Sequence, residues 1–179
     1  MTAFEIIFLI ALSLYFINLV VFTIGASKNY PKLPKEKLPT ATVIVAARNE
    51  EKNIYECLVS LDKLEYPENK LEIIIVNDNS TDNTEKIISD FIKDNPKFKL
   101  YVPEKILGNL KGKANALANA LKIAKGEIIL TTDADCIVNP KWVETICSYY
   151  QDDVAFVGGF TTQEDKTAFQ AMQAIDFVY

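Results

Sequence analysis

The 179-residue chain contains no histidine. This absence excludes, within the chain, a serine nucleophile activated by histidine, a zinc site built on histidine, and a kinase loop of the His-Arg-Asp type. Any catalysis by these residues must therefore use carboxylates, amines or a bound metal.

Cysteine is also scarce, because Cys57, Cys136 and Cys147 are the only three and none are spaced Cys-x-x-Cys. An odd number without metal-type spacing favours free thiols in a reducing compartment. The chain lacks both the Walker spacing Gly-x4-Gly-Lys-Ser/Thr and the dinucleotide pattern Gly-x-Gly-x-x-Gly. A basic surplus is missing as well, since the net charge is −5, and we expect no nucleic-acid partner.

Charge is absent from one long stretch, residues 6–26. As a helix this stretch would extend about 30 Å, the thickness of a bilayer core, so residues 1–26 are expected to form a transmembrane anchor. A cleaved signal peptide is the alternative, but Glu5 precedes the stretch without Lys or Arg, and the stretch is long for a signal. Residues 27–40 hold four lysines and three prolines, which indicates a semi-rigid linker and predicts a cell-membrane protein whose globular part is cytoplasmic.

Beyond residue 40, apolar runs rich in β-branched residues alternate with helical patterns. The strands are expected at 41–47, 71–77, 98–102 and 127–131, and the helices from about 49, around 87–92, over 111–125 and over 140–150. This alternation predicts an α/β fold with a parallel sheet and right-handed crossovers. Asn49 is expected to cap the first helix, and Asp82 with Glu85 to cap the second. A tail at 167–179 also has helical spacing.

Polar clusters follow three of the expected strands, at the end where open α/β sheets bind their ligands. They are Arg48-Asn49-Glu50, Asn77-Asp78-Asn79-Ser80 and Asp133-Ala134-Asp135. Asp78 precedes the capping residues of the next helix, so its carboxylate is expected to face the crevice and to accept hydrogen bonds from a base or ribose.

Asp133 and Asp135 are one residue apart after an apolar run, and extended geometry directs both carboxylates to the same side. Two unpaired carboxylates would repel each other. A divalent cation such as Mg²⁺ or Mn²⁺, which also binds phosphate oxygens, would relieve the repulsion. The alternative interpretation is a capped turn, in which Asp135 or Asn139 caps the helix that follows.

A fourth cluster spans residues 108–115 and contains Lys111 and Lys113 beside two glycines at the expected start of a helix. Cationic side chains and free backbone N–H groups at such a position suit an anionic phosphate. A helical projection places the polar residues opposite the apolar ones: Lys111, Asn115, Asn119 and Lys122 against Leu117, Leu121 and Ala124. The competing interpretation is that the polar face is simply solvated.

Four motifs follow one another in order, at residues 43–50, 75–82, 111–117 and 132–135. Together they resemble the N-terminal half of family 2 glycosyltransferases, which have the GT-A fold, and the likeness covers roughly residues 41–165. The resemblance implies that residues 41–179 form a C-terminally incomplete GT-A domain. It further implies metal-dependent transfer of a sugar, with inversion, from a nucleotide-diphosphate donor that is often UDP-linked to the hydroxyl of a glycan or lipid acceptor.

The resemblance also implies roles for individual residues. The nucleotide-sugar-binding residues would be Ala47, Arg48, Glu50, Asp78, Lys113 and Asp133, and the ligands of Mg²⁺ or Mn²⁺ would be Asp133 and Asp135. Asp78 would contact the base or ribose, and Lys113 would line the uridine side. Many family members carry an acidic residue where this chain has Asn77. The family's catalytic base belongs to a downstream Glu-Asp type motif that does not occur here, so we expect it beyond Tyr179.

Two alternatives remain. A sugar-phosphate nucleotidyltransferase shares the sheet and uses a metal with acidic residues, but such enzymes usually carry a glycine-rich loop where this chain has residues 46–49. A non-catalytic, membrane-tethered nucleotide-binding module would fit a chain that ends at Tyr179. For these 179 residues we expect weak nucleotide binding and no sugar transfer.

Overall fold

The computed structural model describes residues 2–159 and 161, and the chain divides into two compact units after Pro31. The first unit contains one long helix, α1 (Ala3–Ala26). A capping box starts it: the hydroxyl of Thr2 accepts a hydrogen bond from the Glu5 N–H, and the Glu5 carboxylate accepts one from the Thr2 N–H. Within the described part of the chain, α1 is the one helix long and apolar enough to cross a membrane.

Three polar side chains lie within α1, and each is satisfied by the helix itself. Ser13, Asn18 and Thr23 donate hydrogen bonds of 2.8–2.9 Å to the backbone carbonyl oxygens of Leu9, Leu14 and Leu19. Because these donors are paired within the helix, they do not add the free-energy cost of an unpaired polar group when the helix lies in an apolar medium.

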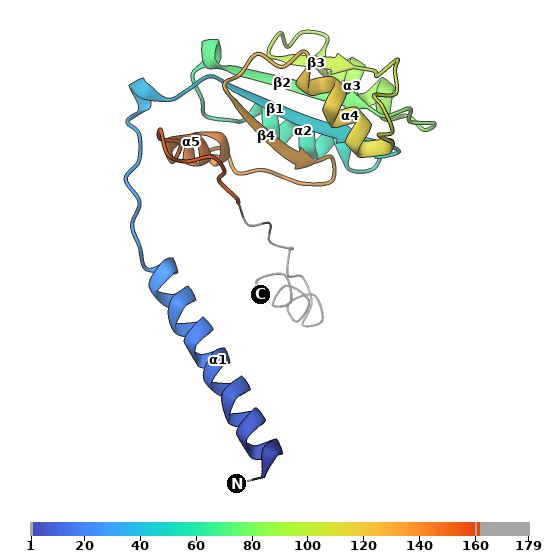
Figure 1. The fold of residues 1–179 in the computed structure, drawn as a ribbon. Coiled ribbons are helices and arrows are strands. Elements are labelled where there is room, and N and C mark those ends of the chain that lie inside the picture. Colours follow the sequence, from blue (N-terminus) through green and yellow to red (C-terminus); the bar gives the residue numbers. More distant parts are fainter. Residues whose placement is uncertain (1, 160, 162–179) are drawn as a thin grey trace. The chain divides into compact units, whose positions relative to one another are not determined.

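The second unit, from Lys32 onward, is built on a four-stranded sheet with the order β3-β2-β1-β4 (Figure 1). The strands are β1 (Ala41–Ala47), β2 (Leu71–Asn77), β3 (Phe98–Tyr101) and β4 (Ile128–Asp133). All pairs are parallel, so the expected α/β fold is confirmed. The register pairs Ala47 with Asn77 and Ala46 with Asp133, so β1, β2 and β4 end at nearly the same level.

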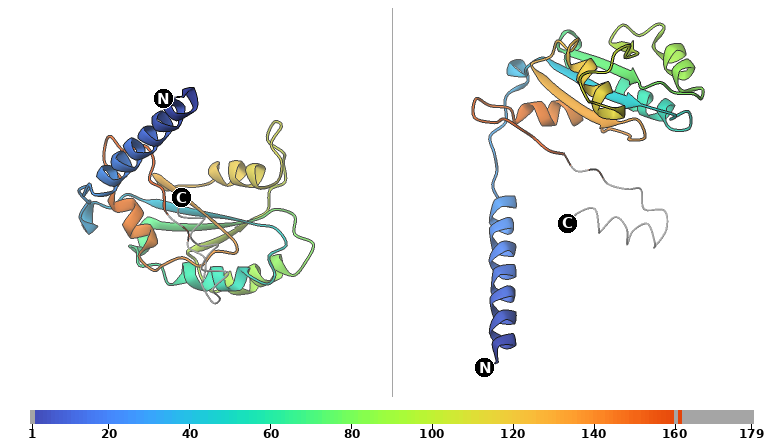
Figure 2. Two further views of the ribbon diagram at one scale, coloured as in Figure 1. Left: turned by 90° about the horizontal axis from the view of Figure 1, so that it is seen from below. Right: turned by 45° about the vertical axis from the view of Figure 1, so that its right-hand side comes forward.

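Helices cover both faces of this sheet (Figure 2). Among the described residues of this unit, the strands are accompanied by the α-helices α2 (Ile54–Asp62), α3 (Thr84–Ile92), α4 (Gly112–Leu121) and α5 (Trp142–Ser148) and by the short 3-10 helices η1 (Lys35–Lys37) and η2 (Glu68–Lys70). The helices α2, α3 and α5 pack on one face, whose core includes Val43 and Ile75. On the other face, α4 contacts the sheet through the small side chains Ala116 and Ala120. Alternating strand residues thus supply two separate cores.

Several expected helix boundaries are wrong. Asn49 does not cap α2, because its backbone φ is 57° and the helix begins only at Ile54. Asp82 does accept a hydrogen bond of 3.0 Å from the Thr84 N–H, as a capping residue would, but the Glu85 carboxylate bonds instead to the side chain of Asn77. At the starts of α2 and α3, polar side chains form hydrogen bonds within and between the loops and do not cap the helices. The helix α4 also ends before residue 125, and the tail at 167–179 lies outside the described residues.

Part of the predicted linker belongs to the second unit rather than to a free connection. The Leu33 N–H donates a hydrogen bond of 2.7 Å to the carbonyl of Ser148, and the Tyr66 hydroxyl donates one of 2.5 Å to the carbonyl of Pro39. Leu38 is 3% exposed and contributes to the core. These contacts explain why the unit begins at Lys32, ahead of its first strand.

The three cysteines are free thiols, as expected. Burial, with smaller contributions from nearby Cys136 and Asp135, raises the pKa of the Cys57 thiol to about 12. Burial likewise raises the pKa of Cys147. Both buried thiols therefore behave as small apolar core residues near neutral pH.

A cluster at the amino ends of the strands fixes the connection between α4 and β4. The Gly126 N–H donates a hydrogen bond of 2.8 Å to the hydroxyl of Thr42, which in turn donates one of 2.9 Å to Glu72. The Glu72 carboxylate also accepts from the Lys125 N–H at 3.0 Å and pairs with Lys99. This cluster ties together three strands and one connecting loop.

We predict that Gly126→Ala destabilises the second unit by about 1–3 kcal/mol, because a Cβ atom would meet well-fixed backbone. Such a Cβ would lie 2.4 Å from the Thr42 nitrogen and 2.5 Å from the Ala41 carbonyl carbon. Urea unfolding measures the change. The control is Gly158→Ala, whose Cβ would meet an ordinary contact of 3.5 Å with Phe156. Equal stability of the two variants would contradict this account.

The Glu72 carboxylate makes the stability of the second unit depend on pH. Burial raises the pKa of Glu72, but hydrogen bonds from Lys99, Lys125 and Thr42 outweigh it and hold the pKa below the ordinary value of 4.5. A lowered folded-state pKa means that Glu72 contributes stability above pH 4.5, and that this contribution is lost as pH falls through the folded-state value. The free energy of unfolding should therefore fall more steeply with acid in the wild type than in Glu72→Gln. Parallel pH profiles from chemical denaturation would refute this.

Candidate functional site

One open pocket of about 270 Å³ lies at the carboxyl ends of β1, β2 and β4. Its lining residues are Ala46, Ala47, Arg48, Glu50, Asp78, Gly112, Lys113, Asp133, Ala134 and Asp135. The pocket thus brings together every residue to which the family resemblance assigns a role, but it does not include Lys111. It also includes Gly112, which the sequence reasoning did not assign to the site, although a glycine directly before Lys113 was a usable signal.

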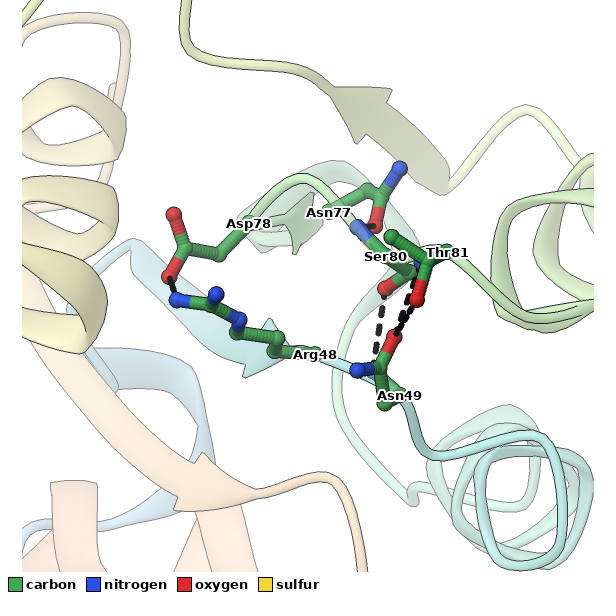
Figure 3. A network of polar contacts seen from close by, with 6 residues as sticks. All are labelled: Arg48, Asn49, Asn77, Asp78, Ser80 and Thr81. Carbon is green, nitrogen blue, oxygen red and sulfur yellow. Dashed lines mark hydrogen bonds and ion pairs between the residues drawn. The ribbon is translucent and has the colours of Figure 1, made fainter.

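Asp78 lies deep in this pocket, with only 6% of its surface exposed. Its N–H continues the sheet pattern by donating a hydrogen bond of 2.9 Å to the carbonyl of Ala47. Its Oδ2 atom lies 3.8 Å from Nη1 of Arg48 (Figure 3). Gly112 has a φ of +52°, and a Cβ there would lie 3.9 Å from the same oxygen. Asp78 is therefore enclosed between the end of β1 and the start of α4, with one edge toward the pocket.

Asn49 holds the loops after β1 and β2 together (Figure 3). Its N–H donates a hydrogen bond of 3.1 Å to the hydroxyl of Ser80, and its Oδ1 accepts from the N–H of Thr81 at 2.8 Å and from the Thr81 hydroxyl at 3.3 Å. The left-handed backbone conformation of Asn49 allows its N–H and its side chain to bond the β2 loop at the same time. Asparagine tolerates this conformation better than most residues do.

The same two loops are joined by further bonds. The Glu50 N–H donates to the Thr84 hydroxyl at 2.8 Å, and the Glu51 N–H donates to Asp82 at 3.2 Å. Hydrogen bonds from the Thr84 hydroxyl, and then from the Thr84 and Glu51 N–H groups, lower the pKa of Asp82. The sequence analysis placed Ser80 in the polar cluster after the second strand but missed its bond to Asn49, and it also missed these further bonds between the loops. No local pattern signals them, because their partners come from separate loops.

Asp133 is the last residue of β4, and Asp135 follows in the adjoining turn. Lys113 reaches across from α4 and pairs with Asp133; the two side chains are 55% and 56% exposed. Neither Asp135 nor Asn139 caps α5, whose cap position is Lys141 without a side-chain bond, but Asn139 Oδ1 accepts a hydrogen bond of 2.9 Å from the Lys141 N–H in the turn before the helix. The Asp135 carboxylate is exposed and lines the pocket.

The charges of the pocket determine which ligands it can hold. Four carboxylates line it, against two cationic side chains. A bare phosphate or diphosphate would therefore meet net repulsion. No group of three His, Cys, Asp or Glu side chains able to hold a metal is found among residues 2–159 and 161. Two hard carboxylates still fit Mg²⁺ or Mn²⁺, because Mg²⁺ typically takes one or two carboxylates and completes its shell with water and substrate phosphate.

The polar face expected on the fourth-cluster helix does not line the pocket, and it is solvated only at its two lysines, Lys111 and Lys122. Asn115 and Asn119 on α4 are only 7% and 5% exposed, whereas Leu121, expected on the buried side, is 51% exposed. Lys113, which the projection did not place on that face, lines the pocket. The projection failed because Ala116 and Ala120, rather than the leucines, provide the main contact with the sheet.

The model of the family described as Glycosyl transferase family 2 matches residues 42–177. Beta-monoglucosyldiacylglycerol synthase of Nostoc sp. is 38% identical over 111 residues, which are 62% of this chain and 23% of that protein. The matched part therefore spans about a quarter of the length of the curated relatives.

Two solved structures are similar to this one. The mannosyltransferase PcManGT from Pyrobaculum calidifontis, in complex with GDP-Man and Mn²⁺, is 30% identical with a TM-score of 0.61, and the match covers 72% of this chain and 38% of that one. TarS 1-349 of S. aureus, in complex with UDP-GlcNAc, is 33% identical with a TM-score of 0.50, and the match covers 59% of this chain and 29% of that one.

We predict that Asn49→Gly destabilises the second unit by about 1 kcal/mol through the lost side-chain hydrogen bonds. Asn49→Ala should cost about 1 kcal/mol more, because alanine is strained in the left-handed region that glycine adopts freely. Denaturant unfolding of the two variants tests both parts. A destabilisation that is no greater for alanine than for glycine would contradict the role of the backbone conformation.

Proposed function

Because the chain belongs to glycosyl transferase family 2, we propose that its second unit binds a nucleotide-diphosphate sugar. The whole protein would transfer the sugar, with inversion, to the hydroxyl of a glycan or lipid acceptor. The observation that carries the proposal is the single pocket shared by Asp78, Lys113 and the Asp133/Asp135 pair. The similar structures hold GDP-Man and UDP-GlcNAc, which supports the donor class, and we favour a UDP-linked sugar from the motif resemblance.

The nucleoside would lie toward Asp78. A buried carboxylate with one oxygen near Arg48 keeps acceptor capacity for the N–H of a base or the hydroxyls of a ribose. The backbone around Ala47 and the side chains of Arg48 and Glu50 would border the nucleotide from the β1 side. Since the loops after β1 and β2 are bonded to each other, this part of the pocket is largely formed in advance of binding.

The diphosphate would lie toward the end of β4. Asp133 and Asp135 would hold Mg²⁺ or Mn²⁺ there, because the excess of carboxylates over cationic side chains disfavours a diphosphate alone. Such a cation, when bound, supplies Lewis-acid stabilisation of charge on the departing diphosphate. Lys113 is held beside this position by its pair with Asp133 and would add a second positive charge.

The proposal extends to location and domain organisation. Residues 1–26 would anchor the protein in the cell membrane, because α1 meets the length and composition that a membrane span requires. The lysines that follow α1 favour a cytoplasmic position for the second unit. Residues 41–179 would form the donor-binding part of the GT-A domain, and the base that activates the acceptor would come from sequence beyond this part.

We predict that the chain binds UDP or GDP in the presence of Mn²⁺ and at least about tenfold more weakly without a divalent cation. Isothermal titration of the folded chain in detergent micelles measures both affinities. Asp135→Asn should abolish most of the metal dependence, since it removes one proposed ligand from an exposed position without disturbing packing.

The matched control is Asp90→Asn, an exposed carboxylate on α3 outside the pocket, which should leave the affinity unchanged. Binding that is equally tight with and without metal would refute the metal site. Absence of binding to either nucleotide, from protein shown to be folded by circular dichroism, would refute the donor site as a whole.

A further inference from the structure

Two asparagines of α4 hold the segment that precedes the helix. This segment, residues 102–111, has no regular secondary structure and lies on the α4 side of the sheet (Figure 2). Asn115 Oδ1 accepts a hydrogen bond of 2.9 Å from the Leu107 N–H, and its Nδ2 donates one of 3.3 Å to the Lys105 carbonyl. One side chain therefore replaces the backbone partners that a strand or helix would have provided.

Asn119 completes the arrangement one turn further along. Its Nδ2 donates to the Lys105 carbonyl at 3.1 Å and also contacts the backbone carbonyl and Oδ1 of Asn115. Both asparagines are nearly fully buried, and every buried polar side-chain atom among the described residues has a partner. Asparagine is a poor helix former, so its presence at two successive turns is explained by the bonds to the loop rather than by helix stability.

The held segment leads directly into the pocket. After Leu107 the chain turns back through a hydrogen bond of 3.1 Å from the Leu110 N–H to the Leu107 carbonyl, and it enters α4 at Gly112. Gly112 and Lys113 both line the pocket, and Lys113 pairs with Asp133. The asparagines thus close a short loop whose other end carries two pocket residues.

We propose that Asn115 and Asn119 are positioning residues of the nucleotide pocket. By fixing residues 105–107 against α4, they set where the Gly112 backbone faces Asp78 and where Lys113 reaches Asp133. Neither asparagine lines the pocket, so they act through the loop rather than on the ligand. This inference rests on the proposed function, because it assigns the donor nucleotide as the ligand whose affinity depends on the loop.

The experiment measures UDP affinity with Mn²⁺, melting temperature and hydrogen exchange of the Leu107 amide in the full chain in detergent micelles. Asn115→Ala should weaken UDP binding about tenfold and speed exchange at Leu107 by a similar factor, with the strand amides of β1 and β2 unchanged. Asn119→Ala should weaken binding in the same direction. Asn109→Ala, an exposed asparagine of the same segment, is the matched control and should leave all three quantities at their wild-type values.

A conservative variant separates positioning from general packing. Asn115→Asp keeps the oxygen that accepts from the Leu107 N–H and loses the longer bond of 3.3 Å to the Lys105 carbonyl, so it should weaken UDP binding less than Asn115→Ala does. The bonds of the Asn119 side chain to Lys105 and Asn115 are all donated by Nδ2, so Asn119→Asp should weaken UDP binding as much as Asn119→Ala does. If Asn115→Ala does not fold, the UDP affinities of Asn119→Ala and Asn115→Asp test the proposal, and wild-type affinity in both variants would contradict it.

Two results would overturn the proposal: wild-type UDP affinity in Asn115→Ala although its Leu107 amide exchanges fast, or weakened affinity in Asn115→Ala although its Leu107 amide is still protected. Failure of the proposed function gives a different result, because the wild-type chain itself would then bind no nucleotide, and the positioning role would fall with it.

Discussion

The parallel register of β1 with both β2 and β4 is the constraint on which the site depends. Because Ala47 pairs with Asn77 and Ala46 with Asp133, the residues that follow β1 and β2 meet the end of β4 at one edge of the sheet. The apolar side chains of the strands fix this register by burial on both faces, since a slip of one residue would exchange the two cores. The position of the pocket is thus a consequence of core packing.

The balance of charge at that edge gives the pocket its chemical character. Acidic groups outnumber basic ones, and those that face the pocket are kept apart by structure: Asp78 is buried beside Arg48, whereas Asp133 and Asp135 lie at the exposed end of β4. A site of this kind suits a ligand that has a hydrogen-bonding part and an anionic part, with a divalent cation between protein and phosphate. A nucleotide-diphosphate sugar has this construction, in agreement with family membership.

The sheet could be predicted from sequence because its strands are apolar runs that end in polar turn residues, and both signals are local. Most residues of the pocket could be predicted for the same reason, since each lies at the end of a strand, follows a strand or begins a helix. Contacts between loops could not be predicted: Asn49 reaches Thr81 only after β1 and β2 have paired. The burial of Asn115 was missed because a helical projection orders the faces of a helix without showing which face meets the sheet. Here the alanines allow the closest approach, and the asparagines turn toward the preceding segment.

The most direct test of the central claim is anomalous diffraction at the manganese edge from crystals of the chain grown with UDP and Mn²⁺. The account predicts a manganese peak bound to carboxylate oxygens of Asp133 or Asp135 and to the diphosphate, with the nucleoside beside Asp78. Well-ordered manganese and UDP at any other place on the protein would contradict it.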